Sequence, residues 1–126
     1  MTRELLAAVK ARMDTAGVPY QYETYQTSGK LPPVYCVGHC SSRPVTEESG
    51  MLSGTFLLTL VGTSWDALTT ARERICWAFP RVAGYSTSDD EYAAVLFFSS
   101  AVAVPCDDAR LKKIQINLKY IEWSVE

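Results

Sequence analysis

The 126-residue chain contains a single histidine, which limits the catalytic sites that it can build. Any Ser–His–Asp or Cys–His arrangement would have to use His39, and no G-x-S-x-G turn frames a nucleophile. The phosphate-binding patterns G-x-x-x-x-G-K-[ST] and G-x-G-x-x-G are also missing. We therefore expect a protein that is not an enzyme and that works without a cofactor.

An excess of positive charge and a long apolar run are likewise missing. Lys and Arg total 12 against 14 Asp and Glu, a net charge of -2, whereas nucleic-acid binding needs a basic surface. The longest apolar run, residues 93–98, is far shorter than the roughly 20 residues of a membrane helix. An acidic residue stands near the N-terminus, where a signal peptide would be basic. We expect no sequence-specific nucleic-acid or membrane binding, a cytoplasmic site of synthesis and four reduced cysteines.

What the chain does contain is two segments with the apolar spacing of amphipathic helices. Thr2 could cap the first helix, which Gly17 and Pro19 would end. Ser64 could cap the second, which Pro80 would stop. The expected buried stripes are Leu5, Leu6, Val9, Met13 and Ala16 in the first helix, and Trp65, Leu68, Ile75, Cys76 and Phe79 in the second, where Ala71 would allow close approach.

The other apolar segments have the short length and the β-branched or aromatic content of strands. The expected strands span residues 20–25, 34–40, 55–61, 82–87, 92–98 and 112–125, and the apolar stretch of the fifth continues to residue 104. The order helix, strands, helix, strands predicts an α+β fold. We expect one domain, 1–126, with two helices packed on one side of a mostly antiparallel sheet.

Cys36, His39 and Cys40 suggest a metal site at first sight. In a strand, however, the two cysteines would lie roughly 13 Å apart at about 3.3 Å per residue, and the histidine would point to the opposite face. Two zinc ligands must both lie close to the ion. The site would require Gly38 to break the strand into a tight turn, so we favour free cysteines that behave as small apolar residues.

The chain also has more apolar and aromatic residues than one buried sheet face requires. Residues 92–104 are apolar at both odd and even positions, and Ile121 and Trp123 are out of phase with the stripe Ile114–Tyr120. A β-bulge near Ile121 with a core on both sheet faces would explain this. A subunit interface would explain it equally well, because aromatic residues are enriched there. The candidate interface residues are Trp77, Phe98, Tyr120 and Trp123.

The element order and several short patterns resemble one family. Pro-x-Val-Tyr at 32–35 precedes a long loop with acidic residues, and Gly62-Thr63-Ser64 leads from a strand into a helix that carries Ala67-Leu68 and Ala71-Arg72-x-x-Ile75. The last strand reads Ile-x-Ile-x-Leu-x-Tyr-x-Glu over residues 114–122. In these features the chain is similar, over nearly its whole length, to the tail terminator (tail-completion, minor tail protein U-like) proteins of long-tailed phages and prophages.

The resemblance implies a structural role in the virion. Such proteins form a ring, usually a hexamer, at the head–tail junction. The ring caps the head-proximal end of the tail tube, stops tube polymerisation and provides the surface for head joining. The implied partners are further copies of the chain, the tail-tube protein and a head-completion or connector protein. Acidic loops are compatible with contact to the tube or its lumen, where DNA must not stick, and equally with solvent exposure. The acidic loop residues are Glu47, Glu48, Asp89, Asp90 and Glu91.

Three alternatives remain open at this point. A head–tail connector or stopper protein would have the same small size and would bind a head-side ring instead of capping tubes. A small metal-binding domain or enzyme would use Cys36, His39 and Cys40. A small-molecule-binding module would need an apolar pocket.

Overall fold

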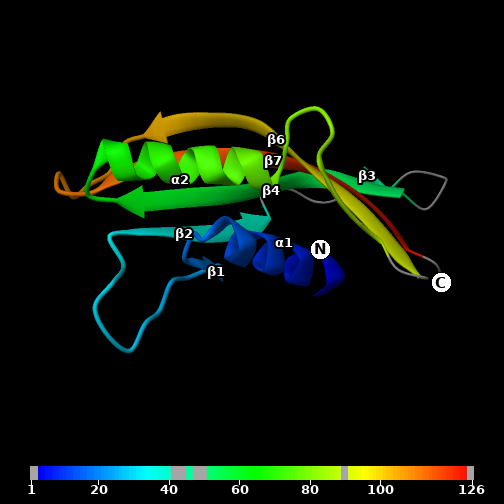
Figure 1. Cartoon of the computed structure of the whole chain (residues 1–126), viewed down its shortest axis with the longest axis horizontal. Helices are drawn as coiled ribbons and strands as arrows, with labels where there is room; N and C mark the ends of the chain where they lie inside the picture. Colours follow the sequence, from blue (N-terminus) through cyan, green and yellow to red (C-terminus); the bar gives the residue numbers. More distant parts are fainter. Residues whose placement is uncertain (1–2, 41–44, 47–50, 89–90, 125–126) are drawn as a thin grey trace.

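The computed structural model describes residues 3–40, 45–46, 51–88 and 91–124 (Figure 1). The helices are α1 (Arg3–Ala16) and α2 (Trp65–Ala78). The strands are β1 (Tyr20–Tyr22), β2 (Val34–Cys40), β3 (Val45–Thr46), β4 (Met51–Gly62), β5 (Tyr85–Ser88), β6 (Tyr92–Val104) and β7 (Lys112–Ser124). Within the described ranges, no helix has the length and apolar character needed to cross a membrane.

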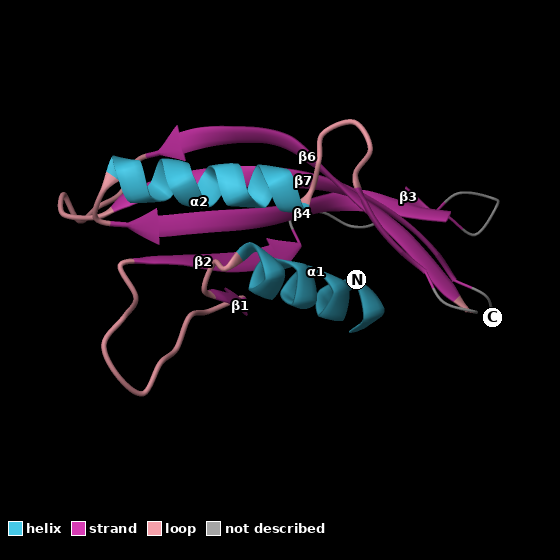
Figure 2. Cartoon of the chain, in the orientation of Figure 1, coloured by secondary structure: helices cyan, strands magenta, loops and turns pink. Residues whose placement is uncertain are grey.

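All the strands belong to one sheet, which is mixed and curled (Figure 2). Its order is β1-β2-β4-β7-β6-β5, with β3 paired to part of β4. β1 and β2 pair in parallel, with Tyr20 opposite Cys36, while the other pairs are antiparallel. The fold is thus a single α+β domain with two helices, as predicted, but the expected mostly antiparallel sheet is corrected to a mixed one.

The helix ends follow from local chemistry. Ser64 is the N-cap of α2, where its side chain accepts a hydrogen bond from the Ala67 backbone N–H. Phe79 is the C-cap and donates its N–H to the Ile75 carbonyl, and Pro80 follows. Gly17 ends α1 with a φ of 76°, a conformation that costs glycine little. The predicted cap Thr2 lies outside the described residues.

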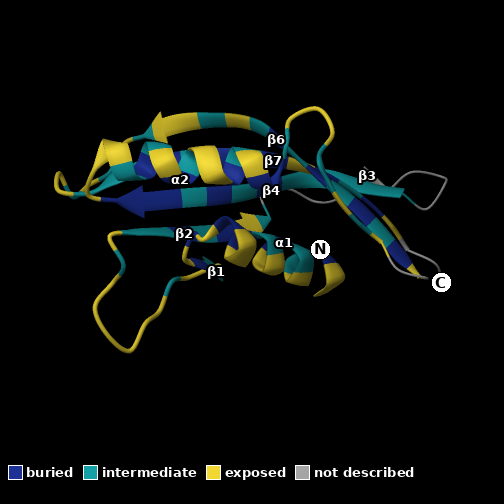
Figure 3. Ribbon diagram, viewed as in Figure 1, coloured by how far each residue is buried: buried dark blue, intermediate teal, exposed yellow. Residues whose placement is uncertain are grey.

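The core lies between the two helices and one face of the sheet (Figure 3). α2 contacts β2, β4 and β7, and α1 contacts β1 and α2. The predicted stripe of α1 is buried apart from Leu6, which is half-buried. In α2 the prediction for Trp65 is wrong, since it is 46 % exposed. At 100° per residue, Trp65 points roughly 100° away from the centre of the buried stripe, which consists of Leu68, Ala71, Ile75 and Ala78.

The alternation of β7 continues through Ile121, so the expected change of face does not occur. β4 and β7 pair in continuous register from Met51–Trp123 to Gly62–Lys112. The residue that continues the buried stripe is Glu122, which is 1 % exposed. The bulge lies instead in β6, where Phe98 pairs with Leu118 and Ser100 pairs with Asn117, leaving Ser99 as the extra residue.

Candidate assembly surface

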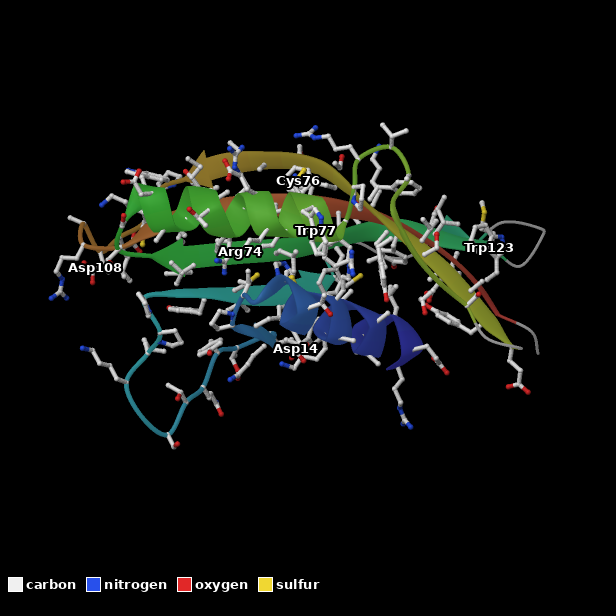
Figure 4. The ribbon with its side chains drawn as sticks, viewed as in Figure 1. Asp14, Arg74, Cys76, Trp77, Asp108 and Trp123 are labelled. Carbon is white, nitrogen blue, oxygen red and sulfur yellow. The ribbon has the colours of Figure 1, made fainter. Side chains whose placement is uncertain are left out.

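The four candidate aromatic residues divide into two buried and two exposed. Phe98 is 3 % exposed and Tyr120 is fully buried. Both belong to the core, so the prediction that they form surface contacts is corrected. Trp77 and Trp123 are 63 % and 41 % exposed, and their role at an interface stays a prediction. The structure does not bring these two together, because Trp77 is on α2 and Trp123 lies near the far end of β7 (Figure 4).

Trp77 is held in place by an arginine from the other helix. The Arg12 guanidinium lies 4.8 Å from the centre of the Trp77 ring and 4.6 Å from that of Tyr85. Its Nε also donates to the Ala78 carbonyl at 2.9 Å, which satisfies a free acceptor at the end of α2. A large apolar ring is therefore presented to solvent in a defined orientation. No sequence pattern indicated a role for Arg12, since this contact joins residues far apart in the chain.

Trp123 stands on the sheet face that carries no helix. It lies opposite Met51 on β4 and Ala93 on β6, and Ile121 lies next along β7 on the same face, opposite Val95. These residues other than Trp123 are half-buried. The apolar residues at alternate positions of β6 are explained in this way: one set is in the core and the other covers the open face.

The charge on the open sheet face comes from one strand. In the described strands, its Asp, Glu, Lys and Arg side chains are Lys113 and Lys119, which belong to the same alternating set of β7 as Gln115 and Asn117. Asn117 donates a hydrogen bond to Ser100 across the strands at 2.8 Å. This face thus combines apolar, amide and positively charged groups.

The predicted acidic loop contacts fall mostly outside the described residues, where Glu47, Glu48, Asp89 and Asp90 lie. Glu91 is described and exposed. The second acidic turn, before β7, is held locally. Asp108 accepts hydrogen bonds from the Arg110 guanidinium and backbone N–H, and these bonds lower the pKa of its carboxyl.

The geometry required for a metal site at Cys36, His39 and Cys40 is not formed. β2 runs without a break through Gly38, whose place under the Tyr20 ring leaves no room for a side chain. Cys36 is buried, and burial raises the pKa of its thiol, which disfavours the thiolate that zinc needs. His39 is exposed on the opposite face of the strand. Among the described residues, no group of three His, Cys, Asp or Glu side chains is placed to hold a metal ion.

Comparison with known proteins shows the fold. No protein-family model matches the chain, and no curated protein does so either. Among solved structures, the chain is similar to a chain of the virion of a native gene transfer agent particle, with a TM-score of 0.62 and 13 % identity, over 88 % of this chain and 83 % of the other. A second solved structure, which carries no functional description, matches with a TM-score of 0.67 and 19 % identity, over 100 % of this chain and 99 % of the other. At these identities the likeness establishes a shared fold, which a virion component also has.

Proposed function

We propose that this protein is a structural subunit of a phage-like virion, and that it acts as a tail terminator. The observation that carries the proposal is the fold shared with a chain of the gene transfer agent virion over 88 % of this chain. In the proposed role, copies of the chain form a ring at the head–tail junction after synthesis in the host cytoplasm. The ring ends polymerisation of the tail-tube protein and receives the head-completion or connector protein.

The surface chemistry supports assembly. Trp77 and Trp123 are large apolar side chains exposed on two different surfaces of the chain. Tryptophan is enriched among the residues that dominate protein–protein binding. A subunit in a ring between a tube and a head contacts neighbours on several sides, so separate contact surfaces are expected. The proposal assigns no catalytic role to any residue.

Electron microscopy of tube polymerisation tests the role directly. Purified chain would be added to polymerising tail-tube subunits, and tube length and tube ends would be imaged. Short tubes that carry a ring of this chain at one end are the expected result. Binding to a head-side connector ring, with tubes of unchanged length, would replace the terminator role with that of a stopper. No effect on tubes and no binding to connector rings would overturn both.

A further inference from the structure

The outer half of β6 has a partner strand on one side only. β7 pairs with β6 along its whole length, from Tyr92 to Val104, whereas β5 reaches only residues 93–96. Beyond β5, the Phe98 N–H donates to the Phe79 carbonyl and the Ser99 carbonyl accepts from Arg81. The segment from Ser100 to Val104 follows these contacts and forms the free edge of the sheet at this end.

The chemistry of this free edge favours pairing with another chain. Exposed strand edges are usually protected by charged residues, by proline within the strand or by a covering segment. The sequence Ser-Ala-Val-Ala-Val at 100–104 contains neither a charged residue nor a proline. Val102 is 54 % exposed, and Ala103 is exposed as well. An unprotected apolar edge of this kind is a template for pairing with a strand of another chain.

The opposite end of the same sheet offers a second, shorter edge, the three-residue β1, in which the Tyr22 carbonyl already accepts from the Thr24 N–H. β1 is the terminal strand there and has β2 as its partner on one side. A groove of about 770 Å³ lies between α1 and β1, and α1 supplies the exposed Ala7 and the Lys10–Asp14 ion pair to it. Its apolar lining includes the half-buried side chains Leu6, Tyr22 and Tyr25. Arg3 also lines the groove, and because its long side chain is exposed, its guanidinium can stay in water while an uncharged strand enters.

We propose that the free edge of β6 in one copy, Ser100–Val104, lies alongside β1 of the next copy, in the groove below its α1. The inference rests on the proposed ring. Ala101 and Ala103 pair with Ile116 and Ile114, so they belong to the sheet face that the helices cover. If the two sheets join with like faces aligned, α1 of the next copy lies over these two alanines. Their small side chains leave room for that helix.

This arrangement selects one way of joining copies. A contact between two different ends of the sheet is head-to-tail, and repetition of such a contact closes a ring when the rotation permits it. Pairing of two β6 edges with each other would instead give a closed dimer and leave both grooves empty. Of these two pairings, the one between the β6 edge and the β1 groove is therefore the one that can build a ring.

Site-specific cross-linking distinguishes the two arrangements. Copies carrying Ala103→Cys would be mixed with copies carrying Ala7→Cys, assembled on tube ends or concentrated alone, oxidised mildly and mapped by peptide mass spectrometry. Peptide mapping identifies the new disulfide despite the native cysteines. A 7–103 disulfide between copies, present only in the mixture, is expected. A dominant 103–103 disulfide, or the absence of both in capped tubes, would overturn the inference.

A charge at the edge provides the second test. Ala103→Lys should reduce the number of capped tube ends at least about tenfold, because it buries a charge at the contact. Val102→Lys gives the same test if the first variant does not fold. The control is Val82→Lys, at a position 93 % exposed in the turn before β5, which should cap normally.

Normal capping by folded Ala103→Lys would reject this contact and leave the terminator role intact. A 7–103 disulfide without capping would reject the role and keep the contact. Wild-type chain that neither caps nor self-associates would reject both.

Discussion

The Tyr92 hydroxyl donates a 2.7 Å hydrogen bond to a carboxylate oxygen of Glu122, and both side chains are buried. Tyr92 begins β6 and Glu122 lies near the end of β7, so the bond ties the two longest strands together at one end. Hydrogen bonds to buried charged groups are among the stronger ones in proteins. This bond gives one carboxyl oxygen of Glu122 a buried partner, which favours an acidic residue in an otherwise apolar stripe.

Removing that donor should destabilise the fold. Tyr92→Phe should lower the free energy of unfolding by about 1–3 kcal/mol, because the buried Glu122 side chain loses this hydrogen bond while the ring remains. Urea denaturation followed by circular dichroism measures the change. Ser86→Ala, at an exposed position of β5, is the control and should change stability very little. An unchanged midpoint for Tyr92→Phe would mean that the bond does not contribute.

The Arg12 contacts predict a difference between arginine and lysine. Arg12→Lys should lower the free energy of unfolding by about 1–2 kcal/mol, because an ammonium group cannot stack between the Trp77 and Tyr85 rings as a planar guanidinium does. Thermal denaturation is the measurement. Lys10→Ala removes an exposed ion pair on the same helix and should have an effect close to zero. Full stability of Arg12→Lys would show that charge alone suffices.

Two glycines make a matched pair for packing. A Cβ at Gly54 would lie 2.6 Å from the Tyr120 hydroxyl oxygen, whereas a Cβ at Gly29 meets no atom within 4 Å. Gly54→Ala should therefore cost about 1–3 kcal/mol, since the buried Tyr120 ring must move. Gly29→Ala should remain within about 0.5 kcal/mol of the wild type. Chemical denaturation of both variants measures the contrast, and equal stabilities would contradict the close packing.

Burial of Cys36 predicts a loss of stability in alkaline solution. Burial raises the pKa of this thiol well above its ordinary value of 9.0. Above that pH the unfolded chain releases the proton and the folded chain keeps it, so the unfolded state binds fewer protons and stability falls as pH rises. Tyr20 adds to the effect above 10.0, since burial also raises its pKa.

Denaturation curves between about pH 8 and pH 11 measure this slope. Cys36→Ala should make the slope shallower, whatever its effect on absolute stability. The same thiol should react with iodoacetamide far more slowly than the half-buried Cys106 in the native protein. Equal rates for the two would contradict the burial of Cys36.

The exposed tryptophans predict a separation of folding from assembly. Trp77→Ala and Trp123→Ala should remain folded, within about 1–2 kcal/mol of the wild type, and should cap fewer tube ends. Trp65→Ala removes an exposed tryptophan at the start of α2 and serves as the control. Capping is counted by electron microscopy and folding is followed by circular dichroism. Unfolding of either variant would place that residue in the core.

The helices were predictable because their signals are local. Ser64, Gly17 and Pro80 act on backbone groups a few residues away, and the apolar spacing identifies the buried side. The long strands β4, β6 and β7 were predictable from their apolar content. The burial of Trp65 was predicted wrongly because an apolar residue in the first turn of a helix can lie away from the buried stripe.

The errors in the sheet have a different origin, since pairing joins distant residues. The parallel pair of β1 and β2 follows from how the 20–34 segment returns, which periodicity does not record. The alternation of β7 was misread because Glu122 counts as polar in a pattern, although Tyr92 makes its burial possible. Phe98 and Tyr120 were predicted as interface residues because sequence does not record how distant strands pair. The exposed edge of β6 had no distinct sequence pattern.

The extra residue Ser99 shifts the alternation of side chains by one position between the two halves of β6. If Ser99 itself took the pairing position opposite Asn117, Tyr92–Phe98 would stay in place in the core and each following residue would turn to the other face of the sheet. Valines would then replace alanines on the helix side of the edge, and alanines would take the open face. Related chains could thus acquire a different neighbour specificity by losing this bulge at constant chain length, without any change in the side chains that keep the domain folded.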